Sequence, residues 1–101
     1  MNTTIYKYLL PYDTAFTIDL PRGATALSVG LQRGVITLWA EVDPTAEKVP
    51  VQFWIIGTGH SLQPVNARGD VVTFLGTVIV HHDDLPEDYV WHVYGDINKV
   101  A

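Results

Sequence analysis

The sequence LSVGLQRGVITLWAEV, residues 27–42, decides the fold of this chain. Two runs rich in β-branched and large apolar residues flank the dipeptide Arg33-Gly34. Gly34 can adopt the positive φ that a two-residue hairpin turn needs, and such runs favour extended strands. The stretch therefore predicts a β-hairpin.

Alternation along the two arms predicts which face of the hairpin is buried, because successive strand side chains point to opposite sides. In the first arm, Leu27, Val29 and Leu31 share one face. In the second arm the residues that share a face are Ile36, Leu38, Ala40 and Val42. Trp39 and Glu41 are left on the opposite side, so we expect Trp39 to face away from the main core.

Five other runs have strand patterning: residues 5–10, 16–20, 49–56, 71–80 and 89–94. Together with the hairpin arms they predict about seven short antiparallel strands in a small sandwich or barrel, an all-β fold with one domain over residues 1–101. The run 49–56 is the best candidate for a central strand, since it is apolar on both faces in its second half. We expect Gly76 to mark a bulge or a close backbone approach, and residues 98–101 to fray.

Composition restricts the classes of function. The chain has 101 residues, 48% of them hydrophobic, a formal charge of -5 and no cysteine. The acidic balance argues against a broad nucleic-acid footprint, because phosphate binding needs clustered Lys and Arg. The lack of cysteine removes disulfides and thiolate metal sites and suits a reducing cytoplasm. An apolar fraction this large in so small a chain predicts a homo-oligomer, and we expect no cofactor and no membrane segment.

The order of several sequence elements resembles a family of small uncharacterised β-rich proteins from phages and prophages. These elements are IYKY, LPRGATALSVGLQRGVITLWAEVD, GTGH, LGTV and VWHVYG. Twelve positions carry the pattern: Gln32, Leu38, Trp39, Asp43, Gly57, Thr58, Gly59, His60, Gly76, Thr77, Trp91 and His92. The resemblance implies a phage-type accessory protein in the bacterial host cytoplasm and no particular reaction, so no catalytic residue is carried over.

The sequence Gly57-Thr58-Gly59-His60 is the main candidate for a binding site. Its backbone amides have little steric cover and are joined by a hydroxyl and an imidazole, a combination that can hold a phosphate or carboxylate. The alternative is a turn that ends a strand, which is the more common role of two glycines without a lysine or a following helix. His92, within an apolar run, is either a core or interface histidine or a hydrogen-bonding group of the site.

Catalytic and metal sites have weaker support. His81-His82-Asp83-Asp84 contains metal-binding side chains, but adjacent strand histidines point to opposite faces, and a solvated acidic loop is the better interpretation. Ser28 and Ser61 lack the context of an activated nucleophile. Glu41 and Asp43 share a strand face and are more typical of exposed charge than of paired catalytic carboxylates.

Two hypotheses of function follow. In the first, a homo-oligomer sequesters a small anionic ligand, such as a nucleotide-derived host signal. The residues expected to bind that ligand are Arg33, Trp39, Gly57, Thr58, Gly59, His60 and His92, with Trp39 stacking on a planar group and Arg33 supplying charge. In the second, the acidic segment 81–88 covers the basic surface of a host defence enzyme or nuclease. A virion or assembly component is a weaker third alternative.

Overall fold

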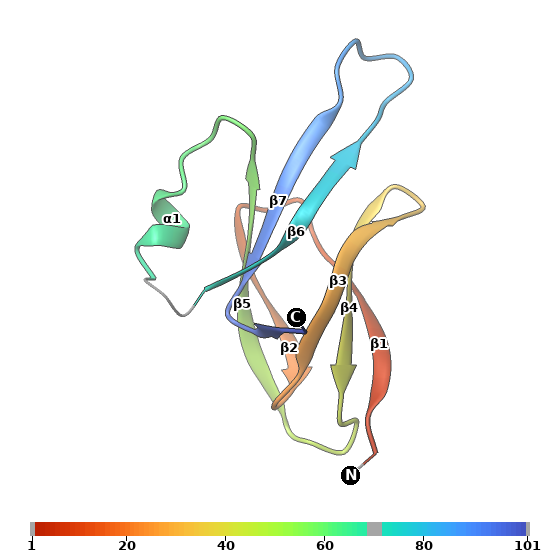
Figure 1. Cartoon of the computed structure of the whole chain (residues 1–101), viewed down its shortest axis with the longest axis vertical. Coiled ribbons are helices and arrows are strands. Elements are labelled where there is room, and N and C mark those ends of the chain that lie inside the picture. The colour runs from red at the N-terminus through yellow and green to blue at the C-terminus, as the bar shows by residue number, and fades with distance from the viewer. Residues whose placement is uncertain (1, 69–71, 101) are drawn as a thin grey trace.

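The computed structural model describes residues 2–68 and 72–100. Within them, eight strands and one short helix follow one another along the chain (Figure 1). Their bounds are β1 Thr4–Leu9, β2 Ala15–Pro21, β3 Thr25–Gln32, β4 Val35–Val42, β5 Lys48–Gly57, α1 Gln63–Asn66, β6 Thr73–Val80, β7 Tyr89–Gly95 and β8 Asn98–Lys99.

The strands form two four-stranded sheets, with the orders β1-β4-β3-β8 and β2-β5-β7-β6. The described residues form no strand pairing that closes them into a barrel, so the all-β prediction is confirmed in its sandwich form. The prediction of about seven antiparallel strands misses β8, which pairs in parallel with β3. Residues 98–99 are therefore held by a sheet, and the expectation that they fray was wrong.

The predicted hairpin is present as β3 and β4. Gln32 pairs with Val35, and the two residues between them have positive φ, 51° at Arg33 and 78° at Gly34. Positive φ at both central positions defines the type I′ turn, whose twist matches that of the two strands. One detail of the prediction was wrong. A bulge between Ala26 and Ser28 leaves Leu27 unpaired, so Leu27 does not share a face with Val29, and Ala26 is the buried residue.

The core lies between the two sheets. Its fully buried side chains come from both of them: Leu20, Phe53, Leu75 and Val93 from one sheet, and Ile36, Leu38 and Val42 from the other. β5 lies between β2 and β7, and residues 53–57 are all buried. The prediction of a central strand buried on both faces in its second half is therefore confirmed.

The second face of β5 is covered by α1, which lies in the connection between β5 and β6. Trp54 and Ile56 point to this side and pack against Val65 of the helix. The Arg68 guanidinium lies 5.6 Å from the centre of the Trp54 ring and forms a salt bridge of 3.1 Å to Asp96. No helix in the described ranges is both long and apolar enough to cross a membrane.

Gly76 joins the two sheets at close range. The pairing of β6 with β7 shifts between Phe74 and Gly76, which confirms the predicted bulge. A Cβ atom on Gly76 would lie 2.7 Å from Cγ2 of Val29 in β3. Only a residue without a side chain allows the two strands to approach this closely.

Replacement of Gly76 by alanine tests this contact. We expect Gly76→Ala to lower the free energy of unfolding by about 1–3 kcal/mol, because the added methyl group meets Val29 and because a residue with a side chain rarely adopts the φ of 155° found at this position. Gly30→Ala is the control, since its Cβ would meet the Trp39 ring at an ordinary 3.5 Å. The control should change the free energy by less than about 1 kcal/mol. Urea unfolding followed by circular dichroism measures both, and equal stability of the two variants would contradict the assignment.

Candidate functional site

The hairpin of β6 and β7 extends beyond the end of β5. β5 pairs with β7 from Phe53 to Gly57, opposite Gly95 to Trp91. β6 pairs with β7 further along, as far as Val80 opposite Tyr89. Figure 1 shows the resulting projection of the two strands at one end of the molecule. Among the residues that the structure describes, the first residues of β7 therefore have a neighbouring strand on one side and none on the other.

The sequence Gly57-Thr58-Gly59-His60 explains why β5 ends there. The Thr58 amide donates to the carbonyl oxygen of Val90 at 3.1 Å, the last backbone hydrogen bond between these segments. Gly59 has a φ of 88°, and the His60 amide donates to the carbonyl oxygen of Gly57 at 3.0 Å. The glycine-rich segment is thus a turn that leads the chain away from the sheet, as one of the two sequence interpretations proposed.

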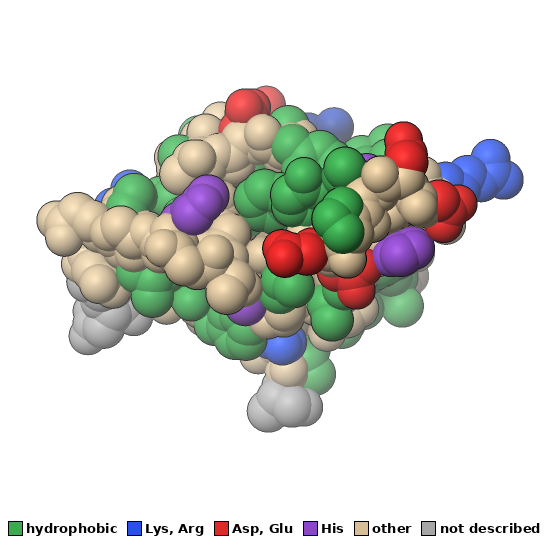
Figure 2. Space-filling view, turned by 90° about the horizontal axis from the view of Figure 1, so that it is seen from above, with side chains coloured by type: hydrophobic (Ala, Val, Ile, Leu, Met, Phe, Trp, Pro, Cys, Tyr) green, Lys and Arg blue, Asp and Glu red, His purple; other side chains and the backbone are tan. Residues whose placement is uncertain are grey.

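An open groove of about 610 Å³ lies where β5 ends beside β7. Its lining residues are Gly57, Thr58, His60, Leu85, Pro86, Glu87, Asp88, Tyr89, Val90 and Trp91. Figure 2 looks onto this end of the molecule, where hydrophobic side chains gather at the centre with acidic side chains around them. The groove therefore has an apolar floor and a charged border.

Aromatic rings form that apolar floor. Tyr89 and Trp91 stack with their ring centres 6.2 Å apart, and Tyr12 meets the Trp91 ring edge-on at 6.0 Å. Tyr89 is 47% exposed and Tyr12 is 54% exposed. Tyr89 and Trp91, together with Tyr12, also line a second opening of about 410 Å³ between the hairpin and the β3–β4 turn. Large aromatic side chains left in contact with water are typical of binding surfaces.

The border of the groove is acidic. Glu87 and Asp88 line it, and no Lys or Arg is among the described residues that do so. Asp88 is held by His81, whose Nδ1 lies 2.7 Å from Oδ1 of Asp88. The second nitrogen of His81 lies 3.5 Å from Asp83. The groove thus favours a ligand that combines apolar surface with positive charge.

His92 connects three strands on the opposite face of the same sheet. Its Nε2 lies 2.8 Å from the Thr58 hydroxyl, and its Nδ1 lies 2.9 Å from the Thr77 hydroxyl in β6. Both ring nitrogens therefore have partners. A half-buried imidazole with both nitrogens bonded to hydroxyls positions the end of β5 against β7 and β6.

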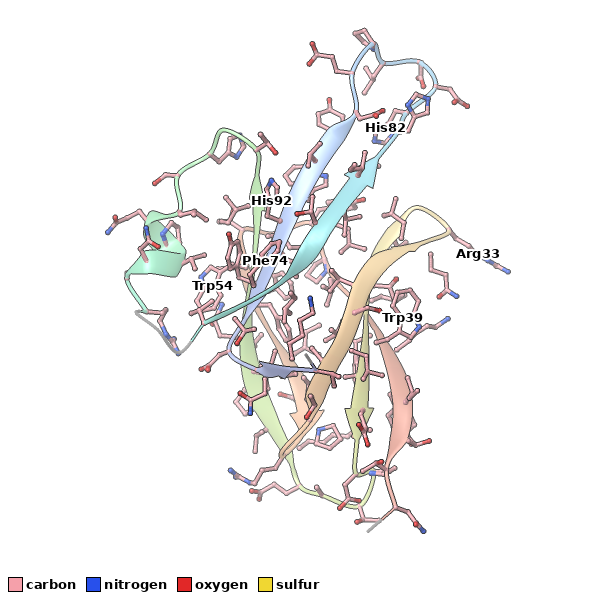
Figure 3. All side chains as sticks on the ribbon, in the orientation of Figure 1. Arg33, Trp39, Trp54, Phe74, His82 and His92 are labelled. Atoms are coloured by element: carbon pink, nitrogen blue, oxygen red, sulfur yellow. The ribbon has the colours of Figure 1, made fainter. Side chains whose placement is uncertain are left out.

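The structure brings together only part of the predicted binding set. Gly57, Thr58 and His60 line the groove, and His92 bonds to Thr58 behind it. Arg33 lies at the tip of the β3–β4 turn, and its side chain points away from the molecule (Figure 3). Trp39 lies opposite Lys7 and Ser28 on the outer face of the other sheet. The prediction that Trp39 shares a face with Glu41 is confirmed, but neither Trp39 nor Arg33 meets the glycine-rich turn.

The turn has few free donors for an anion. The amides of Thr58 and His60 already donate to carbonyl oxygens, and the nearby charges are carboxylates. The His60 ring instead packs on Gly57, where an added Cβ would meet both His60 and Trp91 at 3.3 Å. Gly57 therefore makes room for two rings at the floor of the groove.

Seven of the ten residues that line the groove were not in the predicted ligand-binding set: Leu85, Pro86, Glu87, Asp88, Tyr89, Val90 and Trp91. Of these, Glu87 and Asp88 belong to the acidic segment 81–88 of the second hypothesis. The signal that could have found the two aromatic residues is the occurrence of Tyr89 and Trp91 at alternate positions directly after an acidic loop. Alternation places both rings on one face. It does not tell whether a second sheet covers that face.

The other candidate sites, for a metal ion, a nucleophile and paired carboxylates, do not come together in the described part of the structure. Among residues 2–68 and 72–100, no three His, Asp or Glu side chains converge to hold a metal ion. Ser61 accepts a hydrogen bond of 3.1 Å from the Gln63 amide at the start of α1.

The carboxylates of Glu41 and Asp43 have separate hydroxyl partners, Thr3 and Thr45. The hydroxyl and the amide of Thr45 lower the pKa of the exposed Asp43 carboxyl below its usual value. Each carboxylate is thus engaged locally, and the two are not arranged as an acid and base pair.

The fold and the groove define a small two-sheet β-sandwich with one open aromatic end. A family model described as "Domain of unknown function (DUF7352)" matches residues 1–100. The chain belongs to this family. No curated protein and no solved structure matches the chain.

The hydrogen bonds of His92 provide a test of how the site is held. We expect Thr77→Val to lower the free energy of unfolding by about 1 kcal/mol, because Nδ1 of His92 loses its partner. Thr77→Ser keeps the hydroxyl and should lower the free energy of unfolding by less than Thr77→Val does. Urea unfolding followed by circular dichroism compares the two, and a valine variant as stable as the serine variant would show that the imidazole does not depend on this bond.

Proposed function

We propose that this protein is a non-catalytic binding protein that uses the groove at the projecting β6–β7 hairpin to hold a basic segment of another protein. The observation that carries the proposal is the pair of stacked rings, the exposed Tyr89 and the half-buried Trp91, that line the groove beside Glu87 and Asp88. Aromatic side chains dominate the energy of protein interfaces, and complementary charge selects the partner and speeds association.

This proposal favours the second of the two hypotheses drawn from the sequence. The first, sequestration of a small anionic ligand, needs positive charge or free amides around the groove. The lining carries two carboxylates instead, and two amides of the turn are already bonded. Arg33 and Trp39, which that hypothesis assigned to charge and stacking, lie elsewhere on the molecule.

A biological setting is part of the proposal. We propose that the chain is a phage-type accessory protein and that its partner is a protein of the bacterial host cytoplasm, such as a defence enzyme or nuclease. The support for this setting is the resemblance of the sequence to phage and prophage proteins. The acidic border fits such a role, because enzymes that act on nucleic acid present basic surfaces.

A selection from a library of random peptides displayed on yeast tests the binding function. We expect the wild-type protein to enrich peptides that combine Lys or Arg with apolar residues, and the affinity to fall as salt rises. Tyr89→Ala should weaken the enriched peptides about tenfold or more, because it removes the exposed ring of the aromatic floor. Tyr6→Ala is the matched control, since Tyr6 in β1 is 45% exposed against 47% for Tyr89.

Two outcomes would contradict the proposal. Enrichment of acidic peptides, or equal loss of binding in both tyrosine variants, would remove the groove as the binding site. Native mass spectrometry of the freshly purified protein provides the second outcome. A small anionic molecule that is bound to the wild-type protein and absent from Thr58→Ala would support the small-ligand hypothesis instead.

A further inference from the structure

The groove contains an unpaired stretch of sheet edge. β7 is bonded to β6 along its whole length, while β5 ends opposite Trp91. The carbonyl oxygen of Val90 points to the β5 side, where it accepts the Thr58 amide. In an antiparallel strand the N–H and the C=O of one residue point to the same side, so the Val90 amide points to the β5 side as well. Beyond Thr58, no strand among the described residues lies on this side.

The side chains around this edge are arranged for a strand. Tyr89 and Trp91 point to one face of the sheet, and Val90 lies between them on the other face. A chain added next to β7 would alternate in the same way and place every second side chain on the aromatic floor. Glu87 and Asp88 border the groove at the far end from β5. Carboxylates in this position attract Lys and Arg side chains of the added chain.

We propose that the partner binds by strand addition: an extended, basic segment pairs with the backbone of residues 88–90 and continues the line of β5. This inference rests on the proposed function and names its mode of recognition. Main-chain hydrogen bonds would supply much of the affinity. The aromatic floor and the acidic border would supply the selectivity, as in other cases where a peptide extends a sheet.

This edge differs from the outer edges of β1 and β2. β1 carries Lys7, which bonds to Gln32, and β2 carries Asp19 and ends at Pro21. Charged residues and proline on an edge strand are common devices against pairing. The segment 88–90 instead combines a free edge with an apolar floor. Its charge, on Glu87 and Asp88, selects for basic chains.

A synthetic peptide tests the mode of binding. The probe is acetyl-Thr-Lys-Val-Arg-Ile-Lys-Thr-amide, which alternates basic and apolar residues. We expect it to bind and to slow hydrogen exchange of the Val90 amide, measured by NMR. N-methylation of the central arginine removes one backbone donor and should weaken binding about fivefold or more.

Two charge reversals in the same loop give a matched pair. Glu87 lines the groove and Asp84 does not, although both are exposed. Glu87→Lys should weaken the peptide about tenfold, and Asp84→Lys should change its affinity by less than about twofold. Circular dichroism verifies that both variants are folded.

The results separate this inference from the proposed function. A peptide that binds equally well after N-methylation, without protection of the Val90 amide, would overturn strand addition and leave the groove as a binding site for side chains. Equal loss in the two charge variants would assign the effect to net charge and also overturn it. Failure of this peptide, together with failure of every basic peptide from the library, would overturn the proposed function itself.

Discussion

The contact between Gly76 in β6 and Val29 in β3 determines how the two sheets meet. With a side chain at position 76, the two strands would be pushed apart, and Leu75 and Val78 would lose part of their cover. Further along β6, Val80 lines the second opening together with Gly34 of the β3–β4 turn. The close approach of the Gly76 backbone to the Val29 side chain thus brings β6 and β3 together on the way to the aromatic end.

The groove exists because β5 ends earlier than its neighbours β7 and β6. Had β5 continued past Gly57, its side chains would cover the edge of β7 and the groove would be closed. The glycine-rich turn ends β5 early, while β6 and β7 support each other to Val80 and Tyr89. A free edge and exposed rings normally carry a risk of aggregation, and the carboxylates of the adjoining loop reduce that risk. The same charges limit which partners can approach.

The sequence predicted local features well, because they depend on neighbouring residues. The Arg33-Gly34 turn, the doubly buried end of β5 and the bulge at Gly76 all follow from residue type and alternation. It did not predict β8, whose two residues pair with a strand some seventy positions away, nor the bulge that removes Leu27 from the buried face.

The same distinction holds at the site. Alternation placed Trp39 on an outer face, but only the three-dimensional strand order shows that this face belongs to the other sheet, away from His60 and His92. Likewise, nothing local tells that β7 continues to Tyr89, past the point where β5 ends opposite Trp91.

The hydroxyls of Thr58 and Thr77 lie on either side of the His92 ring. A hydroxyl can both give and take a hydrogen bond, so either tautomer of the ring keeps both partners. The end of β5 is therefore held against β7 and β6 whichever ring nitrogen carries the proton.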